Sequence, residues 1–186
     1  NEIMYAPISA KEGDEYVELL NKGTNDIDLS SWRLADGIDF LFAPGTMILA
    51  GGFLVVAEDL ENLLPRYPQL NPGNTVGNYA GRLSNRGERI ALLRPDDPGL
   101  PFEDLVIVDE VTYCDGDRWG AWTDGGGSSL ELVDPRSDNR LAMNWWGSDE
   151  SSKSSWVTIE YTGPLEQGTL DPSHQFAQTL YVFLAQ

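Results

Sequence analysis

Basic residues are scarce in this chain of 186 residues. Only 12 lysines and arginines stand against 30 aspartates and glutamates, so the formal net charge is −18. Proteins bind nucleic acid largely by neutralising phosphates with lysine and arginine. Since the sequence holds no basic cluster, direct binding to DNA, RNA or an anionic membrane surface is not expected. The acidity favours solubility and is compatible with cation binding.

Cysteine and histidine are nearly absent. Cys114 is the one cysteine, which rules out a disulfide within the chain, and His174 is the one histidine. Two such residues far apart in the sequence do not make a zinc site. They do not supply a nucleophile, a base and an orienting group either. We expect Cys114 to be a small buried hydrophobe, and we expect no catalytic residues and no cofactor.

Long apolar runs are also lacking. No stretch is long enough to span a membrane, so membrane insertion is not expected, and no signal peptide opens the chain. The sequence starts inside one strand-like run and stops just after another. We therefore expect this chain to be an excerpt of a longer protein.

Glycine and proline, by contrast, are frequent and regularly placed. The 19 glycines and 11 prolines fall between short apolar runs, and hydrophobic residues make up 41% of the chain, which is enough for a core. Alternation on most runs indicates strands with one buried face. The pattern predicts an all-β protein, an immunoglobulin-like antiparallel β-sandwich of about nine short strands. A C-terminal extension of two strands follows it.

Local signals add detail to this fold. Val17 should face the core, and Trp32 should be a core anchor. A short helix is expected at 59–65, capped by Asp59 and stopped by proline. The two glycines at 51–52, between apolar runs, predict a hairpin.

The sequence divides into three parts. Residues 1–146 are the sandwich, 147–155 are a serine-rich linker, and 156–186 are a two-strand tail, the expected fragment of a following β domain. Two strands alone do not make a stable domain. We therefore expect the tail to add to a sheet of this chain or to swap into a second chain.

An ordered series of motifs runs through the first part. In sequence order they are NEIMY, EYVELLNKG, DLSSWRLADG, FAPGTMILAGGFLVVAED, GRLSNRGERIALL, VIVDEVTY, DGGGSSLELVDP and NWW. This series resembles the bacterial form of the lamin tail domain, from about Asn1 to Trp146. The segment from Trp156 resembles the start of a jelly-roll, galactose-binding-like domain.

The first resemblance implies an immunoglobulin-like sandwich that acts as a non-catalytic interaction module. It also implies an accessory role in a large exported or cell-surface bacterial protein. No catalytic residues are known for the family, so the resemblance assigns none. The partner is expected to be a protein or a surface polymer.

The stretch 115–127 is the first choice for a contact surface, because loops at the end of a sandwich commonly carry function. It fails as an EF-hand, since Trp119 and Gly126 stand where that loop needs oxygen ligands. A looser calcium site using Asp115, Asp117 and Asp124 is the weaker alternative to plain turn-forming residues.

Aromatic residues in the same stretch suggest a second function. Trp119 and Trp122 could form a sugar platform, although plugging the end of the sandwich is the more common use of such residues. Trp145 and Trp146 are adjacent, so on a strand they should point to opposite faces. The main hypothesis is a non-enzymatic interaction module. Carbohydrate binding or calcium-dependent adhesion through 115–127 is the alternative.

Overall fold

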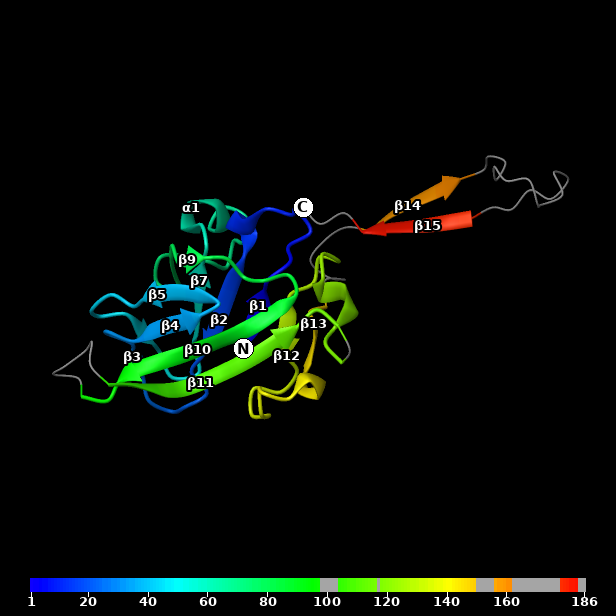
Figure 1. Ribbon diagram of the computed structural model, residues 1–186. Coiled ribbons are helices and arrows are strands. Elements are labelled where there is room, and N and C mark those ends of the chain that lie inside the picture. The colour runs from blue at the N-terminus through cyan, green and yellow to red at the C-terminus, as the bar shows by residue number, and fades with distance from the viewer. Residues whose placement is uncertain (98–103, 117, 150–155, 162–177, 184–186) are drawn as a thin grey trace, which may run out of the picture. The chain divides into compact units, whose positions relative to one another are not determined.

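The computed structural model describes residues 1–97, 104–116, 118–149, 156–161 and 178–183. The chain divides into two compact units, Asn1–Ser148 and Asp149–Gln186. The first unit is built of two packed sheets. Figure 1 shows the long strands β10 and β11 crossing in front of β1 and β2 of the other sheet.

The larger sheet has six strands in the order β13-β12-β1-β2-β7-β8. Its strands are β1 (Glu2–Met4), β2 (Tyr16–Leu20), β7 (Phe53–Ala57), β8 (Thr75–Gly77), β12 (Leu130–Leu132) and β13 (Trp145–Gly147). All neighbours are antiparallel except β7 and β8, which are parallel. The first strand of the chain therefore lies between a nearby strand, β2, and one that arrives more than a hundred residues later.

The second sheet has five strands in the order β11-β10-β4-β5-β9. Its strands are β4 (Arg33–Asp36), β5 (Ile38–Leu41), β9 (Ala80–Gly81), β10 (Gly87–Pro95) and β11 (Leu105–Cys114). The β10–β11 hairpin has a bulge, because Leu92 pairs with Asp109 while Leu93 pairs with Ile107. Val108 is the extra residue on β11. A small ribbon of β3 (Ile27–Asp28) and β6 (Met47–Ile48) completes the strands of this unit.

The core lies between the two sheets and is formed by alternate residues of their strands. Its largest fully buried side chains include Trp145, Tyr5, Tyr113, Phe42, Leu34 and Leu130. Val17 is buried with them, as the sequence predicts, and Trp32 packs on the core while half-buried. Burial of apolar area on this scale, at roughly 25 cal/mol per Å², is the main stabilising term.

A second, smaller core covers part of the outer face of the six-stranded sheet. Helix α1 (Leu60–Leu63) places Leu63 on Met4, Tyr16, Val55 and Ala57. Asp59 caps the helix by accepting a hydrogen bond from the Asn62 N–H, which confirms the predicted cap. Three 3-10 turns complete the unit: η1 (Glu12–Asp14), η2 (Ala121–Thr123) and η3 (Ala142–Asn144).

Two sequence expectations are wrong in their detail. The glycines at 51–52 do not close a hairpin, because β6 pairs with β3 while β7 pairs with β2 and β8. Cys114 is exposed rather than buried. It follows Tyr113, which points inward, and the next residue of a strand points to the opposite face.

The second unit contains β14 (Trp156–Tyr161) and β15 (Gln178–Phe183), which pair with each other antiparallel. Among the residues that the structure describes, these two strands form a sheet of their own. Nothing found supports a jelly-roll domain after the sandwich. No helix in the described ranges has the length and apolar character that crossing a membrane requires.

Candidate functional site

The stretch 115–127 connects β11 of one sheet to β12 of the other, and its middle is pinned to the chain's first residues. The Gly125 N–H donates to the Ala6 carbonyl at 3.1 Å. Inside, the hydroxyls of Tyr5 and Thr123 share a buried hydrogen bond of 2.9 Å. The part of the loop nearest β12 is therefore held against the residues that follow β1.

The two tryptophans of this loop have different environments. Trp119 is 9% exposed and packs against Trp145, with 6.2 Å between ring centroids. Trp122 is 71% exposed. Trp119 therefore belongs to the core and has no free ring face, and this corrects its place in the expected contact surface. Trp122 keeps that place.

Two glycines let the loop lie against its neighbours. A Cβ on Gly120 would stand 2.6 Å from the Gly147 nitrogen, on the end strand β13. One on Gly126 would stand 2.5 Å from the Trp122 carbonyl oxygen. A larger residue at Gly120 would push the loop away from the sheet, and one at Gly126 would clash with the loop's own backbone.

The aspartates of the loop give little support for an ion site. Asp115 and Asp124 are both exposed, and Asp117 lies outside the described residues. Over the described ranges, no group of three or more histidine, cysteine, aspartate or glutamate side chains is placed to hold a metal. A calcium site here stays an untested prediction.

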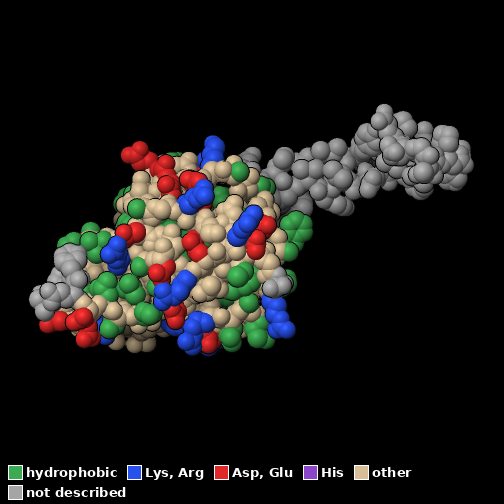
Figure 2. Space-filling model, in the orientation of Figure 1, with side chains coloured by type: hydrophobic (Ala, Val, Ile, Leu, Met, Phe, Trp, Pro, Cys, Tyr) green, Lys and Arg blue, Asp and Glu red, His purple; other side chains and the backbone are tan. Residues whose placement is uncertain are grey.

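Next to the loop is a cavity of about 690 Å³. Three segments line it: residues 6–15 after β1, the bend 82–88 before and at the start of β10, and Asp124 with Gly125. Figure 2 shows acidic side chains gathered at the end of the molecule near helix α1. The volume is in the range of small-molecule binding pockets.

Glu15 is the most unusual residue of this cavity, because it is only 3% exposed. Its Oε2 accepts hydrogen bonds from the Leu83 N–H at 2.8 Å and the Tyr79 hydroxyl at 3.1 Å. Removal from water raises the pKa of the Glu15 carboxyl to about 7, more than these two donors lower it. A proton is therefore easily gained or lost here near neutral pH.

A second carboxylate of the same cavity is bound to the backbone. Glu88 Oε1 accepts from the Ser84 N–H at 2.6 Å and from the Tyr113 hydroxyl at 3.1 Å. Burial raises the pKa of the Tyr113 hydroxyl well above its ordinary value. Tyr113 is therefore a neutral donor, and it holds the 84–88 bend to the core.

The open half of the outer face of the six-stranded sheet has a different character. The strand register places Trp146 opposite Glu131, Glu131 opposite Glu2, and Glu2 opposite Glu18. Trp146 is 65% exposed, while its neighbour Trp145 is 2% exposed and faces the core. The predicted opposition of the two tryptophans is confirmed. One exposed aromatic ring thus ends a row of three carboxylates across three strands.

Two of these carboxylates, Glu2 and Glu18, accept hydrogen bonds from polar neighbours. Glu2 Oε1 accepts from the hydroxyls of Tyr16 and Ser129. Glu18 Oε1 accepts from the Asn1 side-chain amide at 3.0 Å, and burial raises the pKa of the Glu18 carboxyl. Like charges directly opposite one another on a sheet are unfavourable. Hydrogen bonding keeps the row in place in spite of this.

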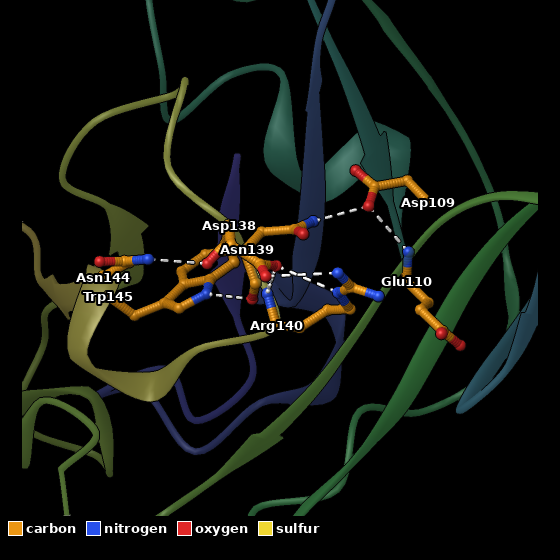
Figure 3. Close-up of polar contacts among 7 residues, drawn as sticks. All are labelled: Asp109, Glu110, Asp138, Asn139, Arg140, Asn144 and Trp145. Atoms are coloured by element: carbon orange, nitrogen blue, oxygen red, sulfur yellow. Dashed lines mark hydrogen bonds and ion pairs between the residues drawn. The ribbon is translucent and has the colours of Figure 1, made fainter.

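The segment between β12 and β13 connects the β13 edge of the six-stranded sheet to the five-stranded sheet (Figure 3). The Asn139 side-chain amide donates to Asp109 of β11 at 2.8 Å. The Asn139 carbonyl accepts from the Trp145 indole N–H at 2.6 Å. One residue thus links the strand that carries Trp145 to the edge of the five-stranded sheet.

Sequence reasoning missed Glu15 and the row of glutamates. Glu15 is one of 30 acidic residues, and nothing in its type marks it. One signal was available, since Glu15, Val17 and Leu19 alternate, which puts an acid on the inward side of a strand. His174, the single histidine, lies outside the described residues. No catalytic arrangement is found among the groups described above.

Comparison with protein families finds a match to the lamin tail domain over residues 1–115. Searches of curated proteins and of solved structures each find no significant match. The matched span is more than half of the chain, and the two-layered β architecture is consistent with an immunoglobulin-like fold. Lamin tail domains are non-catalytic modules. This chain belongs to the lamin tail domain family.

Proposed function

We propose that the chain is a protein-docking module of a larger exported or surface-attached bacterial protein. The observation that carries the proposal is the exposed ring of Trp146 on the open half of the outer sheet face. Val133, the first residue after β12, is exposed too. Tryptophan is enriched among the residues that contribute most to protein interfaces.

The chemistry of this face favours a basic protein partner. The row of Glu2, Glu18 and Glu131 lies beside the Trp146 ring. A lysine or arginine could pair with a carboxylate and lie over the indole at once. The net charge of −18 would speed the approach of such a partner and repel an acidic one.

Site-specific photocrosslinking in cells that produce the full-length protein tests this docking. A photoreactive phenylalanine analogue at Trp146 should give one protein adduct. Leu49 is a matched control position, being apolar and similarly exposed. The same analogue at Leu49 should give none. Equal adducts at both positions, or none at either, would contradict a docking face at Trp146.

A second candidate function, carbohydrate binding, is favoured by the exposure of Trp122. An open indole ring on a glycine-rich loop can stack on a sugar. Glycan-array binding that is lost in Trp122→Ala and kept in Trp146→Ala would support this function. No binding across a broad array would count against it.

The two-strand tail suggests how the module joins a larger assembly. We propose that β14 and β15 extend a sheet of another copy or another domain, since a two-stranded ribbon is at best marginally stable alone. Light scattering after size exclusion should show self-association of the full chain and a monomeric 1–148 fragment. A monomeric full chain with a protease-sensitive tail would be evidence against it.

A further inference from the structure

The cavity at Glu15 is distinct from the outer sheet face, and its chemistry can be argued independently. A buried glutamate normally has a positively charged or metal partner. Glu15 has neither among the described residues, where its two hydrogen-bond donors are the neutral Tyr79 hydroxyl and the Leu83 N–H. The charged groups with the largest effect on its pKa, Glu12 and Glu58, are also acidic.

One oxygen of Glu15 remains available. Both donors bind Oε2, and no hydrogen bond to Oε1 is found within the described part of the chain. In that part, Asn1 Oδ1 is the single side-chain oxygen or nitrogen that is both sealed from solvent and unpartnered. Glu15 Oε1 is therefore not sealed, and the space it reaches is the cavity that Glu15 lines.

The other walls narrow the class of ligand. Glu15, Glu88 and Asp124 present carboxylates, which disfavour an anion. None of the described residues that line the cavity is aromatic, so they offer no stacking surface for a sugar and no cage for quaternary ammonium. Three basic residues also line the wall: Arg82 is paired with Glu12 at 3.0 Å, while Lys11 and Arg86 are exposed. The four carboxylates of Glu12, Glu15, Glu88 and Asp124 still outnumber them. The ligand class that fits this lining best is a positively charged group rich in hydrogen-bond donors.

The cavity also has an apolar side. Pro7, Ile8 and Leu83 line it, and Ile8 is exposed at its mouth. Lysine and arginine carry a charged head on an apolar stem, and such stems pack on apolar surface while the head reaches polar groups. A free small amine would leave this side uncovered.

We propose that this cavity is a binding site for a lysine or arginine side chain of a partner protein segment. The charged head reaches Glu15 Oε1, with Glu88 and Asp124 around it. The stem packs on Pro7, Ile8 and Leu83. The site does not depend on docking at Trp146, and a partner can use either one alone.

Nuclear magnetic resonance titration of the ¹⁵N-labelled chain tests the proposal. The probes are blocked pentapeptides with lysine, arginine or norleucine at the centre of a glycine frame, and spermidine as a free polyamine. The lysine and arginine peptides should shift the amides of Leu83, Ser84 and Gly125 in a saturable way. Norleucine has the stem without the charge, and it should shift them at least tenfold less at the same concentration.

Variants separate recognition from folding. Glu15→Gln should weaken binding of the lysine peptide by tenfold or more. Asp124→Asn should weaken it two- to threefold, and because Asp124 is exposed this variant should fold normally. Glu61→Gln, an exposed helix position, removes one negative charge elsewhere and should leave binding unchanged.

Several outcomes would overturn the proposal. These are no saturable shifts with either basic peptide, equal shifts with norleucine, or unchanged binding in both Glu15→Gln and Asp124→Asn. Tighter binding of spermidine than of the peptides would assign the cavity to a free polyamine instead. A weakening in Glu61→Gln equal to that in Asp124→Asn would mean that only the overall charge attracts the peptides.

Discussion

The inner and outer faces of the six-stranded sheet differ most sharply on β13. Trp145 points inward, where it packs on Trp119 and donates its indole N–H to the Asn139 carbonyl. Trp146, the next residue, points outward beside a row of glutamates. The same residue type therefore has two roles, fixed by the alternation of a strand. One is part of the core, and the other is exposed to solvent.

The outer face itself is divided. One half is covered by helix α1, whose Leu63 closes a small apolar cluster over Met4 and Tyr16. The other half carries Glu2, Glu18 and Glu131. A sheet face that is apolar throughout needs a covering layer throughout. Charged residues let half of this face stay open.

The largest effect is expected for the paired tryptophans of β13. Trp145→Ala should lower the free energy of unfolding by about 3–5 kcal/mol, because it removes a large core side chain and leaves a cavity. Trp146→Ala should change it by less than about 0.5 kcal/mol. Urea unfolding followed by circular dichroism measures both. Similar losses in the two variants would remove the contrast between the faces.

The covered half of the outer face can be tested at helix α1. Leu63 is fully buried, so Leu63→Ala should cost about 2–4 kcal/mol. Glu61→Ala changes an exposed residue on the same helix and should cost less than about 0.5 kcal/mol. If thermal unfolding shows no difference between these two variants, the helix does not contribute a second core.

Glu15 is an acid on the inner side, and it should make stability depend on pH. Folding raises its pKa from 4.5 to about 7, so the folded state holds the proton more tightly than the unfolded chain. Its contribution to stability is complete below about pH 4.5 and is lost as the pH rises to about 7. Relative to Glu15→Gln, the free energy of unfolding of the unaltered chain should fall by about 1–3 kcal/mol as the pH rises over this range.

Denaturant unfolding at pH 4.5 and pH 7.5 provides the measurement for Glu15. Glu61→Gln serves as the control, since that residue is exposed and should give the same stability difference at both pH values. A difference for Glu15→Gln that does not change with pH would mean that the Glu15 carboxyl is better hydrated than its burial implies.

The smallest effect is expected where the two sheets are fastened together at their edge. Asn139→Ala removes the hydrogen bond to Asp109, which is exposed, and should cost about 0.5–1 kcal/mol. Hydrogen exchange of the β13 amides should be faster in this variant. Unchanged exchange would show that packing of Trp145 alone holds the edge.

The sequence was sufficient for features that depend on neighbouring residues. Alternation predicted strands and the opposition of Trp145 and Trp146. A capping aspartate followed by leucines and a proline predicted helix α1. The class of fold was predictable for the same reason. The count of strands came out higher than the nine expected, because β3, β6 and β9 are two residues long and too short to alternate.

Pairing partners could not be read from the sequence. The two glycines at 51–52 have the composition of a hairpin turn, yet the strands on either side join different partners. β1 pairs with β12 only because the folded core brings distant segments together. The cavity at Glu15 has the same origin, since its three lining segments are separated by most of the unit. The only local sequence signal of this cavity was the alternation of Glu15 with Val17 and Leu19.

The contribution of β12 and β13 has a practical consequence for anyone who trims the protein. A fragment ending at residue 115 would match the family over its whole length, yet it would lack the strand that borders β1 and the indole that fills the core. The edge of β1 would then have unpaired backbone N–H and C=O groups that can pair with another copy of the chain. Aggregation of the shortened chain is the expected result. Cutting after Ser148 instead keeps the sheet whole.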